Sequence, residues 1–242
     1  MKSNTKVILA VACVALAALA CEAVTGGGGS DTPVAPSDTG VPVVPTEVQP
    51  STGDVLLSDD FSSSKWGTGT DADSSVEYAS EALQMIVFTK NYFVWSTPPN
   101  SQDYQNVHME VTVINNDTDS TTGFGLMCNQ QAGADNSFYY FAITPAGEYA
   151  IAKAEQGVQA DIFLTNNDEW ANSDLISKNA SSYRVGADCG NSNLTLYVDG
   201  QQIASVSDST YTGGGVALFT WSGEEATSTN VSFDDFVMLE LP

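Results

Sequence analysis

The segment from Asn193 to Leu241 constrains the fold most strongly, because short runs of alternating apolar and polar residues repeat along it. Such alternation with period two predicts strands with one buried face; the first run alternates Leu194, Leu196 and Val198 with Thr195 and Tyr197. Asp199-Gly200 follows at once, and this dipeptide is typical of a two-residue type I′ hairpin turn. The segment therefore predicts an antiparallel hairpin.

The hairpin turn also predicts a register for the two strands. A two-residue turn places Leu196 opposite Ile203, whereas Val206 falls out of phase with the buried face. We therefore expect a bulge, or the end of the strand, near Ser205. The glycines 213–215 predict the next turn, the alternation resumes in 216–221, and 231–241 is expected as the closing strand.

The same pattern predicts strands throughout residues 54–242, and no segment shows the 3.6-residue period of an amphipathic helix. Roughly a dozen short strands separated by turns indicate an all-β, antiparallel β-sandwich. A domain of roughly 190 residues buries about 70% of its unfolded surface, which suffices for a core. The strands are expected at 55–61, 76–78, 83–88, 92–95, 107–113, 123–129, 138–144, 149–154, 182–189, 194–198, 201–205, 216–221 and 231–241.

Two segments at the ends of this region carry a resemblance to a known superfamily. The opening VLLSDDF (55–61), followed by Trp66, and the closing FDDFV (233–237) resemble concanavalin A-like jelly rolls. That superfamily includes laminin-G-like modules, legume-lectin relatives and laminarinase-like glycoside hydrolases. The resemblance implies that the first and last strands lie close together and that a concave sheet holds the ligand.

The first 20 residues are typical of a bacterial lipoprotein signal peptide. Lys2 and Lys6 precede an apolar run that is too short for a final membrane span, and Ala18-Leu19-Ala20-Cys21 resembles a lipobox. The resemblance implies lipidation of Cys21 and an extracytoplasmic protein whose only membrane contact is its lipid anchor. An ordinary signal peptide cut after Ala20, or an uncleaved anchor, remains an alternative.

Residues 21–53 are expected to form the lipidated cysteine and a linker. Four successive glycines (26–29) and five prolines among Ser, Thr and Val cannot bury a core. The linker would therefore hold the domain away from a membrane surface.

The charge of the chain excludes some partners. Lys and Arg number 7 against 30 Asp and Glu, for a formal net charge of −23. Without the leader, which contains Lys2 and Lys6, the charge becomes −25. Such a protein repels phosphate groups and anionic polymers, so nucleic acid is not expected as a partner.

Two cysteines remain outside the leader and the lipobox, Cys128 and Cys189. An even pair in an oxidising compartment favours a disulfide over two buried thiols. Both residues continue the apolar face of a predicted strand.

Calcium is the metal ion that the resemblance implies. In laminarinase-like relatives an aspartate of the closing strand binds Ca²⁺ together with backbone groups near the domain start; Asp235 matches that position, and Asp60 is the second candidate ligand. The alternative is that both aspartates cap turns.

Catalytic motifs are missing from the sequence. The Glu-x-Asp-x-x-Glu run of laminarinase-like enzymes is absent, and no Gly-x-Ser-x-Gly elbow is present. His108, the only histidine, lies opposite the apolar face of its predicted strand, beside Glu110, and is interpreted as an outward-facing residue without a catalytic role.

Aromatic residues are the remaining candidates for a ligand site. Trp95, Tyr140, Trp170 and Trp221 could stack on sugar rings, or they could fill the core instead. The leading hypothesis is a surface-anchored, non-catalytic module that binds neutral carbohydrate or another extracellular ligand. A glycoside hydrolase or lyase on the same fold is one alternative, and a structural or adhesive envelope lipoprotein is another.

Overall fold

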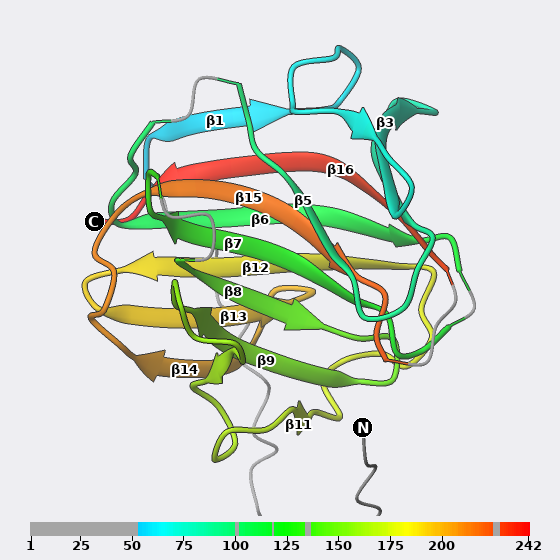
Figure 1. Cartoon of the computed structure of the whole chain (residues 1–242). Helices are drawn as coiled ribbons and strands as arrows, with labels where there is room; N and C mark the ends of the chain where they lie inside the picture. The colour runs from blue at the N-terminus through cyan, green and yellow to red at the C-terminus, as the bar shows by residue number, and fades with distance from the viewer. Residues whose placement is uncertain (1–52, 100–101, 118, 134–136, 225–227) are drawn as a thin grey trace, which may run out of the picture. The chain divides into compact units, whose positions relative to one another are not determined.

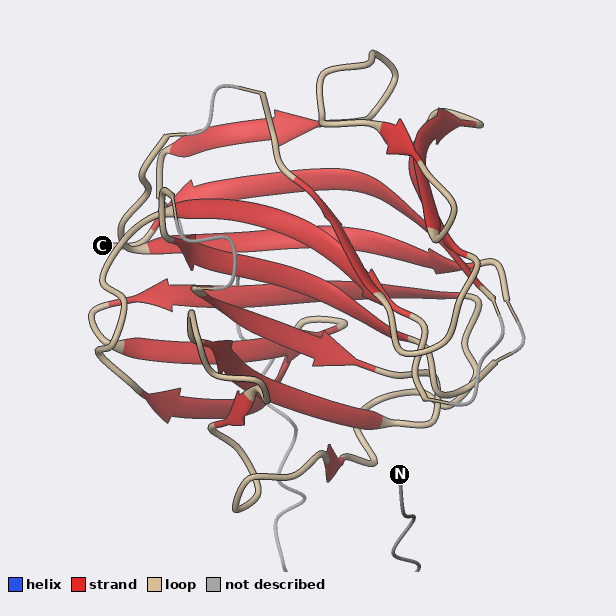
Figure 2. Ribbon diagram, viewed as in Figure 1, coloured by secondary structure: helices blue, strands red, loops and turns tan. Residues whose placement is uncertain are grey.

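The computed structural model describes residues 53–99, 102–117, 119–133, 137–224 and 228–242, and it has no helix within these ranges (Figures 1 and 2). Among the described residues there is no helix of the length and hydropathy needed to cross a membrane. Cys21 and the linker up to residue 52 lie outside the described residues.

The strands form two antiparallel sheets that pack face to face, as Figure 1 shows. Sheet A has the order β14-β13-β12-β6-β16-β4-β3-β2, with β1 paired to β16; its strands are β1 (Val55–Asp59), β2 (Gly69–Thr70), β3 (Ser74–Ala79), β4 (Ala82–Val87), β6 (Val107–Asn115), β12 (Ser182–Gly190), β13 (Asn193–Val198), β14 (Gln201–Ser207) and β16 (Thr229–Glu240). Sheet B has the order β10-β9-β8-β7-β15-β5, with β11 paired to β9; its strands are β5 (Phe93–Ser96), β7 (Gly123–Gln130), β8 (Phe138–Ile143), β9 (Glu148–Ala154), β10 (Ile162–Phe163), β11 (Ala171–Asn172) and β15 (Gly215–Trp221). The predicted antiparallel sandwich is confirmed.

The main core lies between the sheets and takes alternate residues from each strand. In β7, Phe124, Leu126 and Cys128 all point into it and are fully buried. Cys128 forms a disulfide with Cys189 of β12, with their Cα atoms 6.6 Å apart. The predicted pairing is therefore confirmed, and it ties sheet B to sheet A across the core.

The hairpin at Asp199-Gly200 forms as predicted, because both residues have positive φ angles (50° and 76°) between β13 and β14. The predicted register is wrong beyond the first two pairs: Leu196 pairs with Ala204, and the bulge lies at Ile203 rather than near Ser205. The earlier bulge returns Val206 to the inner face, where it packs against the core, so the strand continues to Ser207.

Strand β16 occupies the middle of sheet A. One edge pairs with β6 along most of its length, while the other edge pairs first with β4 and then with β1. The register shifts between Asp234 and Val237, and Asp235 there has a φ of 49°. The bulge lies where β16 changes partner from β4 to β1, and it places Asp59 opposite Phe236, as expected for adjacent opening and closing strands.

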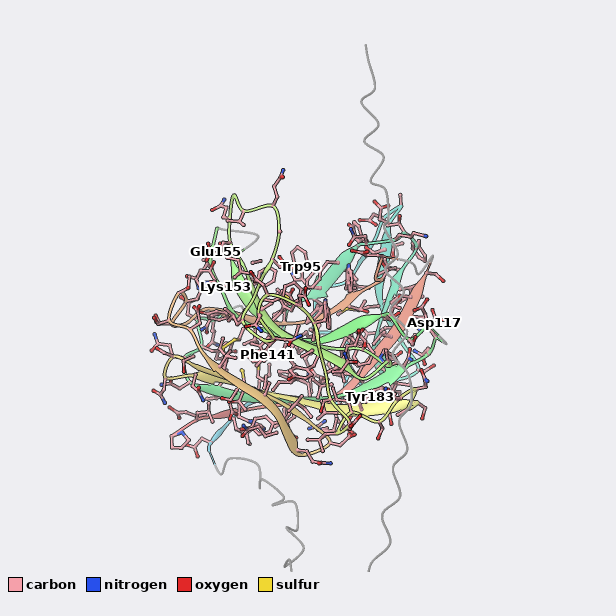
Figure 3. All side chains as sticks on the ribbon, turned by 90° about the horizontal axis from the view of Figure 1, so that it is seen from below. Trp95, Asp117, Phe141, Lys153, Glu155 and Tyr183 are labelled. Carbon is pink, nitrogen blue, oxygen red and sulfur yellow. A yellow bond between two sulfur atoms is a disulfide. The ribbon has the colours of Figure 1, made fainter. Side chains whose placement is uncertain are left out.

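Sheet B is also buried on its outer face. Apolar side chains that alternate with the core residues form a second buried cluster there: Met127, Phe138, Tyr140, Ala142, Ala152, Ala154, Ala217 and Phe219. In Figure 3, Trp95 lies on this outer side, whereas Phe141 and Tyr183 lie deeper, in the main core. Sheet B therefore has two apolar faces. Other segments of the chain bury its outer face only in part.

Candidate functional site

A groove of about 410 Å³ lies over the outer face of sheet B. Ligand pockets have about this size, from roughly 300 to 1,000 Å³, and are lined mainly by apolar and aromatic groups with a few polar ones. The lining residues are Asn91, Phe93, Trp95, Gly123, Phe138, Tyr140, Ala142, Ala154, Glu155, Val158, Gln159, Asp161, Phe163, Trp170, Phe219 and Trp221. All four aromatic residues singled out from the sequence are among them, so the structure brings them to one place.

The floor of the groove is a set of interlocked rings on β5, β8 and β15. Phe93 stacks on Phe219 with ring centroids 4.6 Å apart, and Tyr140 meets Phe219 edge to face at 5.7 Å. Phe93 also contacts Trp95 at 6.0 Å. Offset and edge-to-face pairs of this kind add to the stability gained by burial. Tyr140 is buried, whereas Trp95 is 37% exposed.

One wall of the groove is a pair of tryptophans from distant parts of the chain. Trp170, in the loop before β11, stacks on Trp221 at the end of β15, with centroids 6.0 Å apart and planes inclined by 15°. Trp221 Nε1 donates to Asn91 Oδ1 over 3.1 Å, and Asn166 Nδ2 donates to the carbonyl oxygen of Trp170 over 2.7 Å. Hydrogen bonds therefore hold both sides of the pair in place.

A carboxylic acid stands at another side of the groove, in the segment between β9 and β10. Tyr140 Oη donates to Asp161 Oδ2 over 3.0 Å. Burial raises the pKa of Asp161, and the hydrogen bond from Tyr140 offsets this only in part. Burial, together with the charge of Asp161, also raises the pKa of Tyr140 well above its usual value, so the phenol stays protonated.

Glu155 gives the groove a second carboxylate. Its Oε1 atom lies 3.1 Å from Nζ of Lys153, which also lies 3.1 Å from Asp208 Oδ2. Lys153 thus pairs with Glu155 at the groove and with Asp208 outside it, and it is not itself among the residues that line the groove. The described lining has no lysine or arginine, so its charge is negative.

The sequence reasoning missed several residues of this site. Asp161 and Gln159 lie in a segment without periodicity, and Asn91 precedes a short strand. Phe93 and Phe219 belonged to predicted strands, but alternation alone does not say which face of a doubly buried sheet is solvent-accessible. The sequence of β8 does indicate this burial: the run FYYFAI is apolar on both faces of the strand, which is typical of a sheet buried on both sides.

His108 lies outside the groove, on the outer face of sheet A. The predicted face is correct, but the side chain is buried, at 4% exposure, rather than open to solvent. Its Nδ1 atom lies 2.6 Å from Asp188 Oδ1, and its Nε2 atom lies 3.2 Å from Glu110 Oε1. Burial lowers the pKa of His108, but the hydrogen bonds with Asp188 and Glu110 outweigh it and raise the pKa to about 9.

A separate acidic hollow lies where the opening and closing strands meet. Asp60 and Asp235 both line it, as does the buried Asp59, whose Oδ2 atom accepts no hydrogen bond and lies 3.6 Å from Lys65 Nζ. Asp60 Oδ1 accepts hydrogen bonds from the backbone and hydroxyl of Ser62, which matches the turn-capping alternative.

The oxygens of this hollow fit Ca²⁺ only in part. Asp59 Oδ2 accepts no hydrogen bond but is paired with Lys65, the carbonyl oxygen of Asp235 accepts a 2.6 Å hydrogen bond from Arg184, and Lys65 and Arg184 both line the hollow. The described residues include no group of three or more His, Cys, Asp or Glu placed to hold a metal. Calcium at Asp60 and Asp235 stays a prediction.

No family model matches the sequence, and no curated protein matches it closely enough to be significant. Solved structures do match: carbohydrate binding module CBM66 from Bacillus subtilis (16% identity, 73% of this chain and 96% of that one, TM-score 0.55) and a β-glucanase from Bacillus licheniformis (14% identity, 79% and 100%, TM-score 0.53). A third is a GH16 protein from a Bacteroides ovatus mixed-linkage glucan locus, in complex with a G4G4G3G product (13% identity, 76% and 100%, TM-score 0.54). At these identities the likeness concerns the fold alone: the described domain is an antiparallel β-sandwich that matches the jelly-roll fold of these proteins.

Proposed function

We propose that this protein binds neutral carbohydrate in the groove of sheet B without cleaving it. One observation carries the proposal: Trp95, Tyr140, Trp170 and Trp221, from four separate segments, line a single groove. None of the four belongs to the core between the sheets; Tyr140 is a member of the buried cluster that forms the floor of the groove, and the three tryptophans are only partly buried.

The chemistry of the groove suits a sugar. Flat rings offer surfaces for the apolar faces of pyranoses, while the side-chain amides of Asn91 and Gln159 donate to and accept from sugar hydroxyl groups and the carboxyl oxygens of Asp161 accept from them. Sugar hydroxyls exchange bonds with water for bonds with protein, so the net gain is small. We expect a Kd of roughly 10⁻⁵ to 10⁻³ M, which corresponds to about 4 to 7 kcal/mol.

The fold supports this proposal without deciding between binding and cleavage. CBM66 is named as a carbohydrate binding module, whereas the Bacillus licheniformis protein is named as a β-glucanase, and both share this fold. The absence of the Glu-x-Asp-x-x-Glu run from the sequence favours binding alone.

Asp161 favours a second candidate function, glycoside hydrolysis. A carboxyl group with a raised pKa keeps its proton at higher pH, and it is this protonated form that can donate a proton to a leaving oxygen. Glu155 supplies a second carboxylate in the same groove. In this case Asp161 acts as the general acid and Glu155 as the base or nucleophile.

The placement of the protein is part of the same proposal. Lipid on Cys21 and the Gly- and Pro-rich linker would hold the domain outside the cytoplasm, close to a membrane but free to reach a polymer. An envelope component with a structural or adhesive role is the third possibility, and it requires no ligand in the groove.

One experiment separates the three functions. The purified full chain is titrated with neutral oligosaccharides by calorimetry, and the same mixtures are assayed for new reducing ends. Binding without new ends supports the binding module. New ends that disappear in Asp161→Asn support the hydrolase, and neither signal across a broad panel supports the structural role.

A further inference from the structure

A second hollow, of about 400 Å³, adjoins the groove at the edge of sheet B. Its lining comes from the segment around β2, from β3 and from β5: Gly67, Thr68, Gly69, Thr70, Asp71, Ser74, Val76, Val94, Trp95, Ser96 and Thr97. Trp95 is the one residue that lines both this hollow and the aromatic groove. No function considered so far uses this second hollow.

Strand β5 lies between the groove and the hollow, and its side chains alternate between the two faces of sheet B. Phe93 and Trp95 point to the outer face of sheet B, whereas Val94 packs against the core between the sheets. In the described residues β5 is the last strand of sheet B on this side, paired only with β15. Trp95 therefore lies at the boundary between the groove, on the outer face of sheet B, and the hollow, beyond the edge of that sheet.

The lining of the hollow differs from that of the groove, because hydroxyl groups replace rings. Ser96 Oγ donates to the carbonyl oxygen of Gly67 over 2.7 Å, and Thr70 shares a 2.8 Å hydrogen bond with Ser75. Backbone hydrogen bonds from Asp73 and Ser74 hold the pKa of Asp71 below its usual value, so this carboxyl is ionised at neutral pH. Such a surface hydrogen-bonds to hydroxyl-rich ligands and repels anionic ones.

We propose that the groove and the hollow form one extended site for a neutral polysaccharide chain, which crosses the edge of sheet B over Trp95. The inference rests on the proposed function and narrows it from neutral carbohydrate to chains longer than a disaccharide. Rings in the groove hold some sugar units, hydroxyl and backbone groups of the hollow hold others, and Trp95 contacts the units between them. The carboxyl groups of Asp161 in the groove and Asp71 in the hollow select against uronic acid and sulfated chains.

Gly67 offers a way to fill the hollow without disturbing the groove. A Cβ atom there would have only Ser96 Oγ within 4 Å, at 3.8 Å, and its φ lies outside the left-handed region. Ser96 lines the same hollow, so a longer side chain at this position extends into it. Gly67→Met therefore plugs the hollow, and Gln202→Met, on the exposed face of β14 at the far edge of sheet A, is the matched control.

The test measures affinity against chain length. The purified full chain, Gly67→Met, Gln202→Met, Trp95→Ala and Trp95→Phe are titrated with linear neutral β-glucan oligosaccharides from disaccharide to octasaccharide, and with oligogalacturonates of the same lengths. Melting curves are recorded for every variant, to show that each is folded.

The proposal expects affinity to rise by about tenfold or more between the disaccharide and the hexasaccharide, and Gly67→Met to remove that rise while leaving the disaccharide unchanged. Trp95→Ala weakens the long chains most, Trp95→Phe recovers part of the loss, and oligogalacturonates bind at least tenfold less tightly. Affinity that is independent of length, or a length dependence that survives in folded Gly67→Met, overturns the extended site but leaves the proposed function standing. Absence of binding to every oligosaccharide overturns both.

Discussion

The backbone of Gly123 lies directly beneath the ring of Trp221: a Cβ atom on Gly123 would lie 3.2 Å from Cε3 of Trp221 and 3.6 Å from Cη2 of Trp170. Glycine at the start of β7 thus leaves room for the stacked tryptophans that form a wall of the groove. A methyl group here would crowd the ring of Trp221, which would have to shift by a few tenths of an ångström, and would touch Trp170 at an ordinary van der Waals distance.

Replacement of Trp221 tests whether the wall serves binding or stability. Because the ring is only partly buried and faces the groove, Trp221→Ala should weaken oligosaccharide binding by about tenfold, yet lower the free energy of unfolding by only about 1 kcal/mol. Gly123→Ala should weaken binding in the same direction, by less. Calorimetric titration and chemical denaturation measure the two effects.

Phe219→Ala is the control for this prediction. Phe219 lies under the groove and is 1% exposed, so its removal should cost about 3–5 kcal/mol of stability. A loss of similar size in Trp221→Ala would mean that the tryptophan is a core residue, against the role given to it here.

Stability should fall as the pH rises from neutral to alkaline. His108, 4% exposed, lies between Asp188 and Glu110, and Glu110 Oε2 also accepts a 3.1 Å hydrogen bond from Arg184 Nε, while Tyr197 Oη donates to Asp188. Folding raises the pKa of His108 from 6.5 to about 9. The stabilisation is therefore fully present below about pH 6.5 and is lost as the pH rises through about 9.

His108→Gln should flatten this dependence. The variant should be less stable than the parent at pH 6, and its Tm should change much less between pH 6 and pH 9. Differential scanning calorimetry across this range provides the measurement. A parent protein whose Tm is constant from pH 6 to 9 would contradict a protonated His108 in the folded state.

The disulfide between Cys128 and Cys189 should account for much of the stability of the domain. It closes a loop over a sequence separation of 61 residues, for which chain entropy gives about 4 kcal/mol as an upper value. The double variant Cys128→Ala/Cys189→Ala should therefore unfold at a markedly lower denaturant concentration. Alkylation without reductant, followed by intact-mass measurement, should find no free thiol at either position in the native protein.

Lipidation of Cys21 is expected from the leader alone, since the residue lies outside the described part of the chain. The native protein should carry acyl mass on Cys21 and partition with membranes. Cys21→Ser should carry none and fractionate as a soluble protein, with unchanged glycan binding. A native protein that is soluble and free of acyl groups would point to an ordinary signal peptide cut after Ala20.

Calcium binding at the acidic hollow can be measured by linkage. An ion that binds only the folded state raises Tm by mass action, so millimolar Ca²⁺ should raise Tm and a chelator should lower it. Asp235→Asn and Asp60→Asn should reduce the shift, whereas Asp199→Asn, in the turn after β13, should leave it unchanged. Equal melting curves with and without Ca²⁺ would leave Asp60 and Asp235 as turn-capping residues.

The strands of this fold could be predicted because their signal is local. Alternation in 107–113 and 193–198 and the dipeptide Asp199-Gly200 depend only on neighbours in the sequence, and the structure has strands and a turn at those places. The disulfide could also be predicted, because the domain has only two cysteines that can pair. The short strands β2, β10 and β11, of two residues each, left no such pattern.

The features that could not be predicted depend on contacts between distant segments. The bulge at Ile203 arises because Ala204 and Val206 must face a core built from other strands. The burial of His108 depends on Asp188 and Tyr197, which reach it from β12 and β13. In the same way, the sequence suggested four aromatic residues for the site, but Asp161 becomes relevant only because Tyr140 lies 3.0 Å away from it.

The position of β16 in the middle of sheet A has a consequence for the order in which the chain can be synthesised and folded. Strands β1, β4 and β6 each pair along one edge with β16, which leaves the ribosome after every other strand described here. Until residues 229–240 emerge, β6 and β4 present unpaired edges and the inner face of sheet A lacks its central row of apolar side chains. The native pairing of sheet A is therefore completed only after the last strand described here has been synthesised, and the long-range pairs of β16 with β1, β4 and β6 are among the late contacts of folding.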